Sequence, residues 1–118
     1  MYKIAPDIFR KRLLIEGYFI KEVSEKTILD FFKHITVKLN LKTYGDAIVH
    51  ATGGAGKESN QGYDAFIPLI DSGIYLAAWS KQKFLSLIIY TCKDFDEMTA
   101  LQMTKDFFII TEAEYKLF

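Results

Sequence analysis

The stretch that decides the fold runs from Gln61 to Cys92 and reads QGYDAFIPLIDSGIYLAAWSKQKFLSLIIYTC. Three apolar runs fill most of it, at 63–70, 74–79 and 84–92. The turn sequences Asp71-Ser72-Gly73 and Ser80-Lys81-Gln82-Lys83 separate these runs. Short apolar runs divided in this way predict strands joined by tight hairpins, and therefore an antiparallel arrangement. Pro68 predicts an edge or a bulge in the first strand, because proline has no N–H to donate to a neighbouring strand.

Outside this stretch the pattern predicts three more strands and two helices. The strands are expected at 10–20, 47–51 and 109–117. Ser24 is a good N-cap for the first helix, whose apolar residues fall on one face: Ile28, Phe31, Phe32, Ile35 and Leu39. Asp94 is predicted to cap the second helix, with Glu97 three residues later closing a capping box.

This order of elements predicts a single α+β domain over residues 1–118. Hairpins dominate, so we expect a two-layer sandwich: one largely antiparallel sheet with both helices on one face. The other face would carry Phe, Tyr, Ile and Leu side chains with no helix to cover them. Such a surface commonly enters a subunit interface. We therefore expect a homodimer in which two sheets pack together in an α/β/β/α arrangement.

Composition excludes several other classes of protein. Half of the 118 residues are hydrophobic, and 15 basic residues balance 15 acidic ones. Balanced charge removes the general electrostatic argument for nucleic acid or an anionic membrane as partner. One cysteine cannot form an internal disulfide, so the cytoplasm is the expected compartment. No apolar run approaches about 20 residues, and the N-terminus lacks the features of a signal peptide.

Specific residues at 61–92 resemble those of the prokaryotic S-adenosylmethionine decarboxylases. The matching positions are Gln61-Gly62, Asp71-Ser72, Ile74, Trp79 and Tyr90-Thr91-Cys92. The spacing from Ser72 to Cys92 agrees with that family without a gap. The segment LLIEG at 13–17 is also similar to the family's first strand.

The resemblance implies an activity and a cofactor. Enzymes of this family cut their own chain, here between Asp71 and Ser72, and convert the serine to a pyruvoyl group. The pyruvoyl carbonyl forms a Schiff base with the substrate amine and accepts electrons as carbon dioxide leaves. Cys92 would return a proton to the substrate carbon. The implied function is a carboxy-lyase acting on S-adenosylmethionine in polyamine (spermidine) biosynthesis.

Departures from the family pattern leave that activity open. The histidine that assists processing falls on Ala77, the processing serine falls on Asp64, and Asp71 replaces a glutamate. General acid–base help is commonly worth ~10²–10⁴ in rate, so its loss predicts slow or absent self-cleavage. One alternative is an unprocessed protein or non-catalytic subunit that binds S-adenosylmethionine or a related amine. Another is a different reaction that uses Asp64 or Cys92.

Each candidate residue also has a structural interpretation. Ser72 fits an ordinary hairpin turn, Cys92 a small buried side chain at a strand end, and Asp64 a solvated carboxylate. Five aromatic residues predict a ligand-binding wall for a sulfonium and an adenine, or else core and interface packing: Tyr63, Tyr75, Trp79, Phe84 and Tyr90.

The glycine-rich segment from Thr52 to Gln61 is interpreted as a lid over a dimer-interface pocket. It does not match a phosphate loop, because Ala51 and Glu58 stand where a glycine and a hydroxyl residue are required. His34 and His50 are interpreted as structural residues. No spacing of His, Cys, Asp and Glu indicates a metal site.

Overall fold

The computed structural model describes residues 3–52 and 61–118. Within these ranges the chain forms six strands and two helices in the predicted order. The elements are β1 (Lys11–Phe19), α1 (Glu25–Lys38), β2 (Ile48–Ala51), β3 (Gly62–Leu69), β4 (Ser72–Trp79), β5 (Phe84–Thr91), α2 (Glu97–Phe108) and β6 (Ile110–Leu117). The predicted sequence of elements is therefore confirmed.

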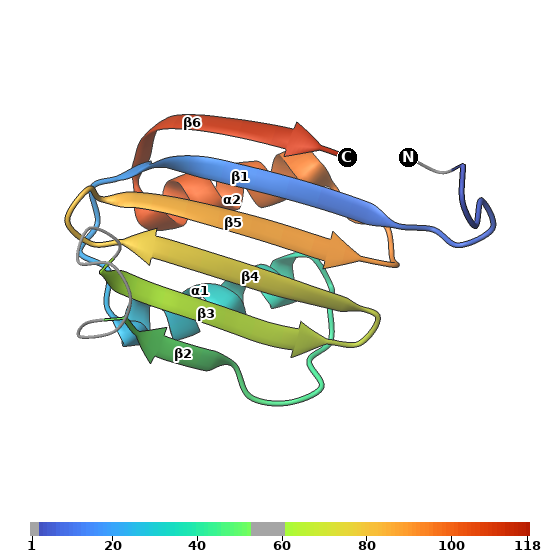
Figure 1. Ribbon diagram of the computed structural model, residues 1–118, viewed down its shortest axis with the longest axis horizontal. Coiled ribbons are helices and arrows are strands. Elements are labelled where there is room, and N and C mark those ends of the chain that lie inside the picture. Colours follow the sequence, from blue (N-terminus) through green and yellow to red (C-terminus); the bar gives the residue numbers. More distant parts are fainter. Residues whose placement is uncertain (1–2, 53–60) are drawn as a thin grey trace.

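The strands form one sheet in the order β2-β3-β4-β5-β1-β6. Every neighbouring pair is antiparallel. Both helices lie on the same face of this sheet, behind it in Figure 1. The predicted α+β architecture of two layers is confirmed.

The core fills the space between the sheet and the helices. Alternate residues of β5 show how it is built, since Leu85, Leu87 and Ile89 are fully buried. The predicted apolar face of α1 supplies Ile28, Phe31, Phe32, Ile35 and Leu39, all of them buried. Each fully buried side chain of this size contributes about 1.5–3 kcal/mol relative to an exposed one, so this layer holds the helices on the sheet.

The two helices begin at residues of the expected type, but one of the two predicted caps is wrong. Ser24 caps α1, and its hydroxyl accepts a hydrogen bond from the Thr27 N–H at 3.3 Å. For α2 the cap is Asp96, whose carboxylate accepts from the Thr99 N–H at 3.2 Å. Asp94 is instead bound by Lys11, whose Nζ donates to it at 2.9 Å.

All six strands differ from their predicted ranges by one or two residues at one or both ends, and three of these differences are informative. β4 begins at Ser72 rather than at Ile74, because a loop of only two residues joins the paired Leu69 and Ser72. β5 ends at Thr91, one residue before Cys92. β6 begins after Ile109, since that residue is the left-handed C-cap of α2.

Pro68 lies in the part of β3 that extends past the end of β2, on the side of the strand away from β4. β3 is the second strand of the sheet, but β2 pairs with it only as far as Phe66. The carbonyl of Pro68 accepts from the Tyr44 N–H at 3.1 Å, on the side away from β4. The proline nitrogen points to the same side, so the sheet loses no hydrogen bond there.

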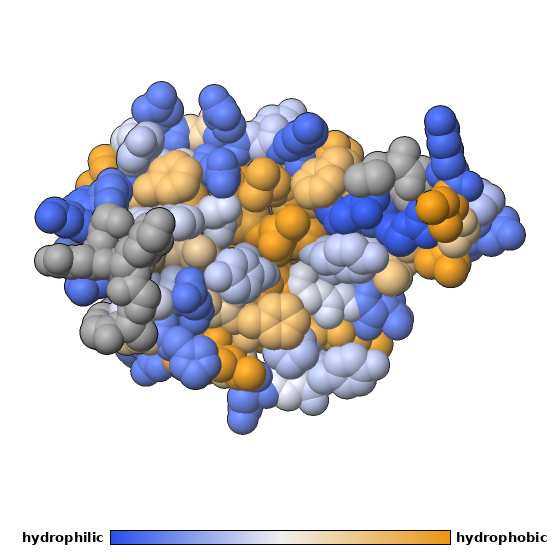
Figure 2. Space-filling view, in the orientation of Figure 1, coloured by the Kyte–Doolittle hydropathy of each residue, from blue (hydrophilic) through white to orange (hydrophobic). Residues whose placement is uncertain are grey.

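The sheet face opposite the helices is covered by no described segment, and we call it the open face. Its centre is a line of cross-strand neighbours, the apolar row: Leu14, Ile88, Tyr75, Phe66 and Ile48. The exposed fractions of Ile48, Phe66 and Tyr75 are 52%, 42% and 42%. Figure 2 shows the resulting apolar surface across the middle of this face.

Candidate functional site

Ser72 lies on the helix-covered face of the sheet, at the start of β4. Its cross-strand partner is Thr91, the last residue of β5 and fully buried. The Ser72 hydroxyl donates a hydrogen bond to Thr91 Oγ1 at 2.6 Å, and Thr91 Oγ1 also accepts from the Lys93 N–H at 2.8 Å. The prediction that Ser72 stands in the middle of the turn is therefore wrong, because Ile70 and Asp71 form the turn.

Asp71 carries the carbonyl that Ser72 would attack. This residue has a φ of 61°, in the left-handed region that Asp tolerates better than most residues. Its carbonyl oxygen accepts a hydrogen bond from the Cys92 N–H at 2.8 Å. An N–H in that position would also stabilise negative charge developing on the same oxygen.

Ser72 and Cys92 are thus brought to the same end of the sheet, as the sequence predicted. The hydrogen bond between Cys92 and Asp71 comes from the Cys92 backbone N–H. The Cys92 side chain is exposed. The interpretation of Cys92 as a small buried strand residue is wrong, because β5 has ended before it. An exposed thiol at this position remains available for chemistry.

Asp64 and Ala77 are direct cross-strand partners on the open face. At these two positions the sequence resemblance described above implies a serine and a histidine for processing. Asp64 accepts a hydrogen bond from the Tyr75 hydroxyl at 3.2 Å. Burial, followed by the nearby Asp64 charge, raises the pKa of Tyr75 above its ordinary value of 10.0.

The sequence analysis interpreted His50 as a structural residue, but the strand pairing makes it a candidate. It pairs with Asp64 in the register of β2 and β3, so it stands in the same row as Ala77. The sequence separates His50 from Asp64 by the segment 51–63, and only strand pairing brings them together. An imidazole beside a carboxylate can accept a proton and pass it on.

The predicted aromatic wall is only partly assembled. Tyr75, Trp79, Phe84 and Tyr90 lie on the open face, and the Trp79 and Phe84 rings are 5.5 Å apart. The prediction that Tyr63 belongs to this wall is wrong, because Tyr63 packs against the core on the helix-covered face. Trp79 and Ser72 are the two ends of β4, about 23 Å apart at ~3.3 Å per residue.

Two other predictions concern loops and metals. The proposed lid falls on residues 53–60, which lie outside the described residues. Among the described residues, no group of three or more His, Cys, Asp or Glu side chains could hold a metal ion. No helix in the described ranges is long and apolar enough to cross a membrane.

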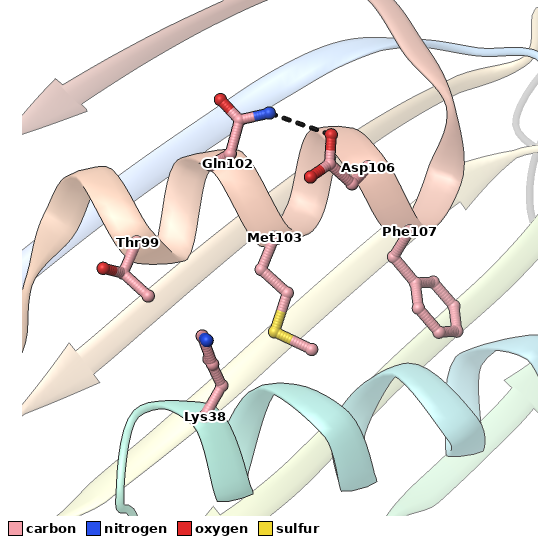
Figure 3. A pocket seen from close by; sticks show the side chains of 6 residues that line it. All are labelled: Lys38, Thr99, Gln102, Met103, Asp106 and Phe107. Carbon is pink, nitrogen blue, oxygen red and sulfur yellow. Dashed lines mark hydrogen bonds between the residues drawn. The ribbon is translucent and has the colours of Figure 1, made fainter.

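A separate hollow of about 600 Å³ lies on the helical layer, lined by Lys38, Thr99, Gln102, Met103, Asp106 and Phe107. Figure 3 shows Met103 pointing from α2 toward α1, with Lys38 at the opposite wall. None of these residues is a predicted site residue. Chemistry-bearing side chains gather on the sheet, so we place the candidate site there.

Comparison with known proteins identifies the fold. No protein-family model matches the chain, and no curated protein matches its sequence significantly. Among solved structures, the adenosylmethionine decarboxylase from Aquifex aeolicus superimposes with a TM-score of 0.77. The match covers 94% of this chain and 89% of that chain, at 12% sequence identity. The chain therefore has the fold of an adenosylmethionine decarboxylase, as the residues at 61–92 predicted.

Proposed function

We propose that this protein is a diverged relative of the S-adenosylmethionine decarboxylases that binds S-adenosylmethionine or a related amine. We further propose that its chain stays largely uncleaved, so that Ser72 remains a serine. The shared fold supports the first statement. The surroundings of Ser72 support the second.

One observation carries the proposal: within the described residues, the Ser72 hydroxyl bonds only to Thr91. Cleavage requires this hydroxyl to lose its proton while it attacks the Asp71 carbonyl carbon. The Cys92 N–H provides the oxyanion contact. A threonine hydroxyl is not a base, and Ala77 has no titratable group and lies on the opposite face of the sheet from Ser72. The residues present therefore do not fit formation of a pyruvoyl group.

The side chains of the open face are suited to binding a cationic ligand. Trp79, Phe84 and Tyr75 offer aromatic faces, which attract a sulfonium or an ammonium group. The Asp64 carboxylate is exposed beside the Tyr75 hydroxyl. Together these groups provide apolar contact area and one negative charge.

The same face supports a homodimer. The apolar row exposes large side chains that a soluble monomer would rarely leave in one contiguous patch. Packing two open faces together would bury both rows and produce the α/β/β/α arrangement. The candidate site would then lie at the edge of a subunit interface.

Intact-mass analysis of the purified protein tests the processing state. We expect one species at 13.6 kDa after long incubation, the same as for Ser72→Ala. Complete cleavage of the unmodified chain would contradict the proposal and support an active carboxy-lyase of polyamine biosynthesis.

Thermal unfolding with ligand tests the binding site. We expect S-adenosylmethionine to raise Tm, with stabilisation of about 2.7 kcal/mol at 100 times Kd. S-adenosylhomocysteine is the matched control, since its thioether lacks the sulfonium charge and should bind less tightly. Carbon dioxide release should stay at background. The ligand assignment fails if S-adenosylmethionine leaves Tm unchanged at saturating concentration.

A further inference from the structure

The edge of the sheet formed by β6 is free to pair with another strand. β6 is the last strand in the sheet order, so among the described strands only β1 pairs with it. Figure 1 shows β6 along one margin of the sheet, with no described element beyond it. The strand is eight residues long and contains neither proline nor glycine. At the other margin β2 spans only four residues, so β6 is the edge that offers a long template.

The register of β6 shows which of its backbone groups face outward. The Arg12 N–H donates to the Phe118 carbonyl at 3.2 Å, and the Phe118 N–H donates to the Arg12 carbonyl at 2.9 Å. Such mutually bonded pairs alternate along antiparallel strands, so Lys116 and Glu114 also bond inward to β1. The N–H and C=O groups that point away from the sheet belong to the residues between them: Ala113, Tyr115 and Leu117.

The side chains of Tyr115 and Leu117 are only half covered. Both lie on the helix-covered face, because their cross-strand partners Ile15 and Leu13 are buried there. Ile110, at the start of β6, is also buried, but Tyr115 and Leu117 are 49% and 45% exposed. The helical layer therefore ends before it covers the C-terminal half of β6. A strand added beside β6 would supply the missing apolar contact.

On the open face, β6 carries a negative and a positive side chain two residues apart. Glu114 lies opposite Glu16 of β1, and like charges in that arrangement repel each other. Lys116 lies opposite the apolar Leu14. Glu114 and Lys116 are exposed, and neither forms an ion pair within the ranges that the structure describes. An added strand is therefore favoured if it brings a cation to Glu114 and a carboxylate to Lys116.

We propose that a second copy of this chain pairs with β6 edge to edge, with Tyr115 opposite the partner's Tyr115. A two-fold axis perpendicular to the sheet passes between these two residues and makes the strands antiparallel. Glu114 then lies opposite the partner's Lys116, and Lys116 lies opposite the partner's Glu114. Ala113 and Leu117 pair in the same reciprocal way. This register satisfies the outward backbone groups and joins the two sheets into one.

Other two-fold registers bring like charges together. Paired side chains must lie on the same face, so each two-fold register is centred on one residue that meets its own copy. Centring on Glu114 or on Lys116 would place that charged side chain against itself. Centring on Ala113 would place Glu112 against Glu114 on both sides of the axis. Like charges directly opposite each other destabilise an antiparallel pair, so the register centred on Tyr115 is preferred.

This edge is separate from the open face and from the candidate site. Ser72 lies on β4, which is three strands away from β6 in the sheet. The perpendicular two-fold axis leaves both open faces on the same side of the joined sheet, where each can still bind a ligand or another chain. The inference therefore goes beyond the proposed function and does not depend on it.

Single-cysteine cross-linking tests the register, in a Cys92→Ser background that removes the exposed native thiol. Tyr115→Cys should form a disulfide-linked dimer on mild oxidation, because the two Cα atoms would lie ~5.5 Å apart. Leu117→Cys is the matched control, similarly exposed on the same strand. Its two copies would be offset by about 13 Å along the strands and should stay unlinked. An equimolar mixture of Ala113→Cys and Leu117→Cys chains should link to each other. Non-reducing electrophoresis measures each product.

A backbone variant tests the pairing itself. Tyr115→Pro removes an outward N–H but no bond to β1, so it should raise the Kd of the edge contact by on the order of 10-fold or more. Tyr115→Phe keeps the N–H and the ring and should leave Kd near the wild-type value. Sedimentation equilibrium compares the three proteins.

The outcomes separate this inference from the proposed function. Equal linking of Tyr115→Cys and Leu117→Cys, or linking of Glu114→Cys in place of Tyr115→Cys, overturns the register. A protein with no linked species, whose association is unchanged by Tyr115→Pro, overturns the edge pairing altogether. Because β6 takes no part in the candidate site, stabilisation by S-adenosylmethionine in that same protein would leave the proposed function standing.

Discussion

The two faces of the sheet have similar sequences and opposite environments. On β5, Leu85, Leu87 and Ile89 are fully buried beneath the helices. Ile88 and Tyr90, which alternate with them, lie on the open face, and Tyr90 is 41% exposed. One face therefore holds the fold together, while the other carries apolar side chains that the monomer does not use. This difference suggests that the open face is kept apolar for binding rather than for folding.

The largest expected effect comes from replacing two neighbouring isoleucines, one on each face of the sheet, by alanine. Ile89→Ala should lower the free energy of unfolding by about 2–5 kcal/mol, because it creates a cavity in the core. Ile88→Ala removes the same atoms from the open face and should cost less than about 1.5 kcal/mol at dilute, monomeric concentration. Urea unfolding measures both variants.

Protein concentration sharpens the same test. If the open face is a dimer interface, the cost of Ile88→Ala should grow with concentration, while that of Ile89→Ala should not. Equal costs at every concentration would mean that the two faces do not differ as described.

The second test concerns the polar end of the helix-covered face. Thr91→Val should cost about 1–3 kcal/mol, because it leaves the Ser72 hydroxyl and the Lys93 N–H without their acceptor. Thr91→Ser keeps the hydroxyl and is the matched control, expected to cost about 1 kcal/mol for the lost methyl group. Chemical denaturation compares them, and a Thr91→Val protein as stable as wild type would show that Ser72 is not anchored there.

The smallest expected effect on stability comes from replacing Lys11. Its Nζ forms ion pairs with Asp94 at 2.9 Å and with Glu97 at 2.7 Å. Bonding to Lys11 lowers the pKa of both carboxyl groups below their ordinary values of 3.8 and 4.5. Burial acts to lower the pKa of Lys11, but its bonds to Glu97 and Asp94 outweigh this and raise it above 10.5.

Lys11→Met should therefore destabilise the protein most between about pH 5 and pH 10. Stability from a lowered carboxyl pKa is lost as pH falls through the folded value, and stability from a raised lysine pKa is lost as pH rises through it. The difference between wild type and variant, measured by urea unfolding, should shrink outside this window. A difference that is constant from pH 3 to pH 7 would exclude the ion pairs as its source.

Local patterns were enough to predict most of the fold. Ser24 and the apolar face of α1 are read from neighbouring residues, and the hairpins follow from short runs and turn sequences. The cap of α2 could not be read in this way, because Asp94 and Asp96 are equally suitable. Lys11 decides between them from 83 residues away in sequence, by binding Asp94.

The candidate site was predictable only for residues that a hairpin or a neighbouring strand brings together. The motif at 61–92 placed Ser72 near Cys92, and their hairpin and strand pairing confirm it. His50 was interpreted as structural because its approach to Asp64 depends on the register of β2. Tyr63 was assigned to the wrong group, because the face of a strand residue depends on a register that the sequence does not state.

The single residue between α2 and β6 has a mechanical consequence. α2 ends at Phe108 and β6 begins at Ile110, so only Ile109, at a φ of 53°, separates these two elements. A linker this short has no slack, and any shift of α2 must move β6 with it. We therefore expect a perturbation of β6 to be transmitted to α2, and hydrogen exchange in α2 to report it.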